Sequence, residues 1–228
     1  MKRYLKKILI ALGLINLPAD DGIKNPIHKW DEDVEFQNIM KMVAGHTIVD
    51  VVRCYILYQM GLQAAMREGD VAEIGVYKGG TAMLLSNTFK GTSKKIHLFD
   101  TFTGMPPADP QKDLHKEGDF NDTSFNGVKA YLSDYSNVML HPGLFPNTAA
   151  SIKESYFSMV HIDVDIYKSV MDCIKFFYPR LAKGGIMIFD DYGYISCPGA
   201  KLAVDEFFVN KKEKPCYLPT GQCLVIKL

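Results

Sequence analysis

Short apolar runs alternate with longer amphipathic stretches along most of the chain. Helical patterns follow four of these runs, at Gly80–Phe89, Phe125–Asp134, Ser169–Leu181 and Lys201–Asn210. An alternation of strands with helices predicts a doubly wound, mostly parallel α/β sheet, whose ligands bind at the carboxyl ends of the strands. The apolar runs that we interpret as buried parallel strands are Val71–Ile74, Ile96–Phe99, Val138–Leu140, Met159–Ile162 and Ile186–Phe189.

The beginning of the chain departs from this alternation. Lysines precede the apolar run Ile8–Leu17, and a polar stretch follows over residues 18–33, so we predict an N-terminal helix and loop over residues 1–34. The run is too short to span a bilayer, and no small-residue cleavage site follows it. We therefore favour an amphipathic helix that packs or forms a homo-oligomer over a targeting segment.

The main domain is expected to cover residues 35–228. It begins with a helical pattern from Glu35 to Met66, in which Thr47 is expected to cap the part that starts at Val49. It ends with two short apolar runs around Thr220-Gly221, which predict a closing antiparallel hairpin. The hairpin brings the expected sheet to seven strands, with helices on both faces.

Composition narrows the function classes. The 228 residues carry 26 basic and 26 acidic side chains, and this zero net charge argues against a dedicated nucleic-acid binder, which usually has a basic excess. The five cysteines are odd in number and form no CxxC pair, so neither a disulfide framework nor a zinc ribbon is expected. Free thiols favour a reducing compartment, and we expect a cytoplasmic protein.

The first predicted strand ends in a glycine-rich turn that starts with a carboxylate. The spacing Glu73-Ile74-Gly75-Val76-Tyr77-Lys78-Gly79-Gly80 differs from the GxGxxG of dinucleotide-binding proteins. A carboxylate there would repel a pyrophosphate, whereas it favours a cationic ligand such as the sulfonium and amino groups of S-adenosylmethionine. The residues that we predict to bind the cofactor in this turn are Glu73, Gly75, Tyr77 and Gly79.

The next two strands extend this cofactor site. Asp100 ends the second strand, where its carboxylate can accept hydrogen bonds from a ribose diol. Thr101 follows it, and Gly143-Leu144-Phe145 follows the third strand, so Thr101, Gly143 and Phe145 are expected to flank an adenine. A turn cap is the structural alternative for Asp100.

Several aspartates follow the fourth and fifth strands. Like charges that close would raise one another's pKa, and a bound divalent cation removes that conflict. Ligation by oxygen atoms alone suits magnesium or a similar hard ion. The predicted metal ligands are Asp163, Asp190 and Asp191, and Asp165 is expected to support the metal or to contact the substrate.

Taken together, these motifs resemble the macrocin-type sugar O-methyltransferases of macrolide biosynthesis. The resemblance covers roughly residues 45–210 and rests on Glu73–Gly80, Asp100–Pro107, Asp119–Ser124, Pro142–Phe145, Asp163–Ser169, Asp190–Tyr192 and Ala203–Phe207. It implies a class I methyltransferase fold, S-adenosylmethionine, magnesium and a sugar hydroxyl as acceptor. It also implies cofactor roles for Glu73, Gly75 and Asp100 and metal roles for the three aspartates. One departure is Val164, where the family usually has glycine.

The expected reaction is methyl transfer to a sugar oxygen whose pKa the metal lowers. Asp163, which we also place at the cofactor, is the candidate proton acceptor, with His161 and His141 as alternatives. The long connection from Gly104 to Asn126 is expected to order over the cofactor or the acceptor. The alternatives are a nicotinamide oxidoreductase, which the glycine spacing disfavours, an O-methyltransferase acting on a non-sugar diol such as a catechol, and a non-catalytic cofactor-binding module.

Overall fold

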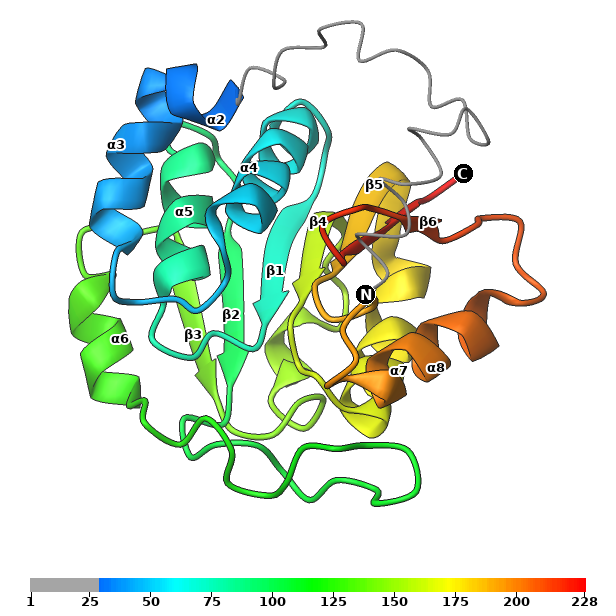
Figure 1. Ribbon diagram of the computed structural model, residues 1–228. Coiled ribbons are helices and arrows are strands. Elements are labelled where there is room, and N and C mark those ends of the chain that lie inside the picture. Colours follow the sequence, from blue (N-terminus) through cyan, green and yellow to red (C-terminus); the bar gives the residue numbers. More distant parts are fainter. Residues whose placement is uncertain (1–28) are drawn as a thin grey trace, which may run out of the picture.

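The computed structural model describes residues 29–228, which form a single seven-stranded sheet in the order β3-β2-β1-β4-β5-β7-β6 (Figure 1). The first five strands are parallel, and β7 pairs antiparallel with both β5 and β6. The predicted mostly parallel sheet with a closing hairpin is confirmed. The strands are β1 (Asp70–Ile74), β2 (Ile96–Asp100), β3 (Val138–Pro142), β4 (Phe157–Ile162), β5 (Leu181–Phe189), β6 (Cys216–Tyr217) and β7 (Cys223–Ile226).

Helices cover both faces of this sheet (Figure 1). Side chains of α3, α4, α5 and α6 share one buried core, and those of α7 and α8 share the other. Val71 belongs to the first core and Ala72 to the second, as the two-residue period of a strand requires. The helices are α2 (Lys29–Glu32), α3 (Val34–Val43), α4 (Val51–Ala65), α5 (Gly80–Thr88), α6 (Phe125–Tyr131), α7 (Tyr167–Phe177) and α8 (Pro198–Phe208), with 3-10 turns η1 (Ala149–Ile152) and η2 (Tyr178–Arg180).

Two predictions for the first part of the chain are wrong in detail. The stretch 18–33 is not entirely a loop, because Lys29–Glu32 forms α2. Thr47 does not cap the following helix: Asp50 does so by accepting hydrogen bonds from the N–H groups of Val52 and Arg53, at 2.9 and 3.1 Å. The predicted N-terminal helix lies outside the described residues, so its role in oligomerisation and the cytoplasmic location stay predictions. Within residues 29–228, no helix has both the length and the apolar character needed to cross a bilayer.

The strand register brings the carboxyl ends of the central strands to one level. Ile74 of β1 lies beside Phe99 of β2 and Ile162 of β4, and Ile162 lies beside Phe189 of β5. The residues that follow these positions therefore emerge together at one edge of the sheet. The chain reverses its direction of strand addition between β1 and β4, which is where a doubly wound sheet opens a crevice for ligands.

The histidine pair His97 and His141, on β2 and β3, makes the stability of the fold depend on pH. His97 Nδ1 and His141 Nε2 lie 3.1 Å apart, and the His141 ring stacks on Phe99. Burial, with a smaller contribution from His97, lowers the pKa of His141 to about 4, against about 6.5 for an unperturbed histidine. Below about pH 6.5, His141 therefore binds a proton in the unfolded chain but stays unprotonated in the folded chain. Protonation of the unfolded chain lowers the free energy of unfolding, so stability is lost progressively as the pH falls towards 4.

We expect the melting temperature of the protein to fall between pH 7 and pH 4, and His141→Phe to make that fall smaller. Phenylalanine keeps the stacking on Phe99 and removes the group that titrates. The measurement is thermal unfolding followed by circular dichroism across this pH range for both proteins. Parallel curves for wild type and variant would show that His141 contributes nothing to the pH dependence.

Candidate active site

A cavity of about 280 Å³ opens at the carboxyl ends of the parallel strands. Of the eleven residues that the sequence assigns to cofactor or metal, three lie outside its wall: Glu73, Gly79 and Asp190. Because the strand ends are level, the other eight meet here although they are far apart in sequence. These eight residues are Gly75, Tyr77, Asp100, Thr101, Gly143, Phe145, Asp163 and Asp191.

The turn after β1 is held by the residue that ends β2. The N–H groups of Val76 and Tyr77 donate to one carboxylate oxygen of Asp100, each at 2.8 Å, and the N–H of Phe102 donates to the other at 2.6 Å. An ionised carboxylate has about four acceptor positions, so about one remains for a ribose hydroxyl. Asp100 therefore acts as a turn cap on the cavity wall, and a ribose bound there would need a further acceptor for its second hydroxyl.

Gly75 is required by the neighbouring strand end. Its φ is 91°, a left-handed conformation, and a Cβ at this position would lie 1.8 Å from the carbonyl oxygen of Asp163. The backbone after β1 thus crosses closely over the backbone after β4. This close contact with Asp163 explains the glycine, and the role of Gly75 in cofactor binding stays a prediction.

Glu73 lies in a buried ion pair behind the cavity wall. Glu73 and His161 are direct neighbours in the register of β1 and β4, and Glu73 Oε1 lies 2.9 Å from His161 Nδ1. The second oxygen of Glu73 is buried and has no hydrogen-bond partner among residues 29–228. Burial alone would lower the pKa of His161, but its hydrogen bonds to Asp190 and Glu73 raise it well above the usual range. Neither His161 nor His141, the alternative proton acceptors, lines the cavity.

Asp190 is fully buried and surrounded by donors. Its carboxylate accepts a hydrogen bond from Gln222 Nε2 at 2.7 Å, lies 3.4 Å from His161 Nε2, and forms a salt bridge with Arg53. Burial alone would raise the pKa of Asp190, but the hydrogen bond to His161 and the charges of His161 and Arg53 hold it below its usual range. Sequence reasoning missed Arg53, because this residue lies 137 positions away on α4 and no local pattern links the two.

Asp163 and Asp191 have the opposite electrostatic surroundings. Burial and the charge of Asp190 raise the pKa of Asp163 well above its usual range, and no described residue donates a hydrogen bond to the Asp163 carboxylate. Burial and the neighbouring carboxylates of Asp165 and Asp163 likewise raise the pKa of Asp191. Clustered carboxylates that remain short of positive partners fit a hard divalent cation, which takes oxygen ligands.

The long connection between β2 and α6 borders the cavity. Gly104, Met105, Pro106, His115 and Phe120 from this connection line its wall. The Tyr77 hydroxyl donates to Asp122 at 2.8 Å, and Lys78 pairs with the same carboxylate at 2.5 Å, so the connection is tied to the turn after β1. Its position at the cavity agrees with the sequence interpretation, and its ordering by a ligand stays a prediction.

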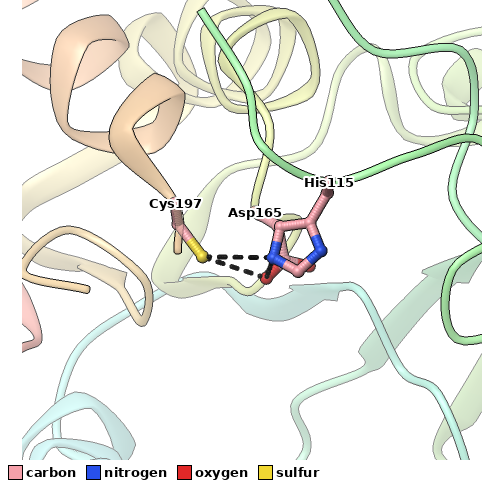
Figure 2. Close-up of side chains that lie close together, drawn as sticks. All are labelled: His115, Asp165 and Cys197. Atoms are coloured by element: carbon pink, nitrogen blue, oxygen red, sulfur yellow. Dashed lines mark hydrogen bonds and ion pairs between the residues drawn. The ribbon is translucent and has the colours of Figure 1, made fainter. Parts of the chain in front are cut away.

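A second group of polar side chains lies on the cavity wall beside the aspartates. Figure 2 shows His115 from the long connection, Asp165 from the turn after β4 and Cys197 from the start of α8 converging on one point. Only Asp165 of these three was recognised in the sequence. Cys197 was interpreted as one of the free thiols, because a single cysteine has no spacing pattern that could identify it.

Comparisons with known proteins find similar sequences in one family. A family described as macrocin O-methyltransferase (TylF) matches residues 41–215. The mycinamicin III 3''-O-methyltransferase of Micromonospora griseorubida is 30% identical over 182 residues, which span 72% of this chain and 70% of that protein. The 8-demethyl-8-(2,3-dimethoxy-α-L-rhamnosyl)-tetracenomycin-C 4'-O-methyltransferase of Streptomyces olivaceus is 27% identical over 68% of this chain and 66% of its own length.

The fold has a solved counterpart in the O-methyltransferase NovP. The two structures superpose with a TM-score of 0.69 at 23% sequence identity, covering 80% of this chain and 82% of that one. The expected class I methyltransferase fold is thereby confirmed.

Proposed function

The chain belongs to the macrocin O-methyltransferase family, and from this premise we propose that it transfers a methyl group from S-adenosylmethionine to a hydroxyl of a sugar, in a reaction that requires a divalent cation such as magnesium. The observation that carries the proposal is the cavity in which the glycine-rich turn of β1 meets the aspartates of β4 and β5. A sugar acceptor, carried by a natural product, a nucleotide or a cell surface, is supported by the relatives named for a rhamnosyl substrate and for a 3'' position.

The cofactor is proposed to bind along the wall formed after β1, β2 and β3. Asp100 offers its remaining acceptor position to the ribose, and Thr101, whose hydroxyl donates to the carbonyl of Gly104 at 2.6 Å, shapes the adjoining wall. Phe145, which is 8% exposed, provides an apolar surface for the adenine. Glu73 lies behind this wall, where its carboxylate is paired with His161.

The divalent cation is proposed to be held by Asp163, Asp190 and Asp191. When bound, it would lower the pKa of the acceptor hydroxyl and hold neighbouring hydroxyls in place. Arg53 and His161 keep Asp190 ionised and fixed in orientation, so that one ligand is charged in advance. The oxygen atoms of Asp163 and Asp191 complete the set from the cavity wall.

The proton of the acceptor hydroxyl is proposed to move to a carboxylate oxygen of Asp163. Its position on the cavity wall supports this role, because a proton acceptor must lie within hydrogen-bond reach of the acceptor hydroxyl. The apolar side chains of Val49, Met105 and Leu144 border the same cavity. Val164 also lies on this wall, where the family usually has glycine, and would narrow the acceptor side.

Calorimetry and turnover assays together test this proposal. We expect the protein to bind S-adenosylmethionine, and to methylate members of a panel of deoxysugar glycosides and nucleotide-linked sugars only with magnesium present. Turnover of catechols without turnover of sugars would favour the non-sugar diol alternative. Cofactor binding without turnover on either panel would favour the non-catalytic module, and failure to bind S-adenosylmethionine would contradict the proposal altogether.

A further inference from the structure

Three side chains with different ligand atoms meet at the rim of the cavity (Figure 2). Cys197 Sγ lies 3.4 Å from Asp165 Oδ1 and 3.6 Å from His115 Nε2, and His115 Nε2 lies 3.6 Å from Asp165 Oδ1. Cys197 is buried, whereas His115 and Asp165 are each 18% exposed in their side chains. The three atoms thus form a nearly equilateral triangle, and all three residues line the cavity.

The dimensions of this triangle match one face of a tetrahedral zinc site. Zinc binds cysteine sulfur at about 2.3 Å, histidine nitrogen at about 2.0–2.1 Å and carboxylate oxygen at about 2.0–2.2 Å, so tetrahedral geometry separates these ligand atoms by about 3.3–3.7 Å. All three observed separations, 3.4, 3.6 and 3.6 Å, fall within this interval.

The ring nitrogen of His115 that lies outside the triangle has its own hydrogen-bond partner. His115 Nδ1 lies 3.1 Å from Asp119 Oδ2, an oxygen that also accepts from the N–H of Lys116 at 2.9 Å. When His115 donates its Nδ1 proton to Asp119, Nε2 can present a lone pair to a cation. Cys197 Sγ and Asp165 Oδ1 present further ligand atoms to the same point, so a cation at the centre would contact all three.

The contact between His115 and Asp119 is typical of a histidine that binds a metal ion. Histidines that bind metals almost always donate their other ring nitrogen to a carboxylate, a backbone carbonyl or water, which fixes the ring orientation and the tautomer. Asp119 supplies this partner from the same connection as His115.

We propose that His115, Asp165 and Cys197 form a zinc site whose fourth tetrahedral position opens to the cavity. The mixed nitrogen, oxygen and sulfur donors suit zinc rather than magnesium, so this site is chemically distinct from the all-oxygen group of Asp163, Asp190 and Asp191. Binding releases the proton of the Cys197 thiol and forms bonds to its sulfur, to His115 Nε2 and to Asp165 Oδ1. A bound zinc ion would also fasten the long connection, through His115, to the start of α8.

The full-length protein, freed of metal and then titrated with zinc or cobalt(II), tests the proposal directly. We expect one zinc ion per chain, and with cobalt(II) the near-ultraviolet charge-transfer absorption of a cobalt–thiolate bond. Cys197→Ser should abolish that absorption and weaken zinc binding at least 100-fold. Cys216→Ser is the matched control, because Cys216 is an exposed thiol outside the cavity and should leave both readouts unchanged.

Two further measurements separate this site from a structural hydrogen-bond network and from the magnesium ligands. Asp119→Asn should weaken zinc binding by about 10–100-fold, as expected for loss of a carboxylate that orients a histidine ligand. Excess magnesium should leave the cobalt–thiolate absorption in place. Absence of that absorption in the wild type, its retention in Cys197→Ser, or its displacement by magnesium would each overturn the proposal. All readouts are of metal binding, so they are independent of whether the proposed sugar methylation is observed.

Discussion

Asp191→Asn is expected to reduce methyl transfer by about 100-fold or more, while leaving the melting temperature unchanged or higher. The variant removes a predicted ligand of the divalent cation, and loss of one group that stabilises developing charge typically costs that much. Asn keeps an oxygen that can accept the hydrogen bond from the Asp165 N–H, now at 3.0 Å, so the turn after β4 should hold. The carboxylate it removes is buried beside Asp163 and Asp165, and loss of that repulsion favours the folded state.

The measurements are initial rates with saturating magnesium and thermal unfolding of the same preparations. Asp172→Asn is the matched control, because it neutralises an α7 aspartate that pairs with Lys168 and lies outside the cavity wall. A chelator should stop the wild-type enzyme, and added magnesium should restore it. If Asp191→Asn retained full turnover and the chelator left the wild type active, the metal-dependent reaction would be wrong.

The parts of the fold that follow from local patterns were predictable. The run Met159–Ile162, apolar except for His161, is buried throughout, as expected for a central parallel strand. Residues directly after such runs had to emerge at one edge, and Asp163 after β4 and Asp190 after β5 do lie close together there, beside His161. The Asp50 cap was missed because Thr47 and Asp50 are both good capping residues, and only the path of the preceding loop decides between them.

The features of the site that the sequence did not predict depend on contacts between residues far apart in the chain. The sequence predicts Glu73 in the cofactor site because it lies one residue before the end of β1, but its register partner His161 holds it behind the cavity wall. Arg53 on α4 pairs with Asp190, and His115 on the long connection lies beside Asp165. Neither segment contains a sequence motif that would predict these partners. Such pairings depend on how helices and loops pack on the sheet, and packing has no short-range signal in the sequence.

Gly75→Ala is expected to destabilise the protein by about 3 kcal/mol or more and to abolish cofactor binding. A left-handed conformation costs a residue with a side chain roughly 1–2 kcal/mol. The new methyl group would also lie 1.8 Å from the carbonyl oxygen of Asp163, so the strand ends must separate, and overpacking of this kind costs about 1–3 kcal/mol more. In a chain of this size, such a loss corresponds to a fall in melting temperature of about 6–12 °C.

Gly91→Ala isolates the steric part of this effect. Gly91 has a φ of 82°, close to the 91° of Gly75, but a Cβ at Gly91 meets no other atom within 4 Å. The Gly91→Ala variant should therefore carry only the cost of the left-handed backbone, which corresponds to a fall in melting temperature of about 2–8 °C. It should retain the affinity of the wild type for S-adenosylmethionine. Thermal unfolding and calorimetry of the two variants separate the cost of the left-handed backbone from the cost of the steric clash with Asp163. Equal losses in both would mean that the turn after β1 can move away from Asp163 without cost, and that the crossing of these two strand ends does not set the shape of the cavity.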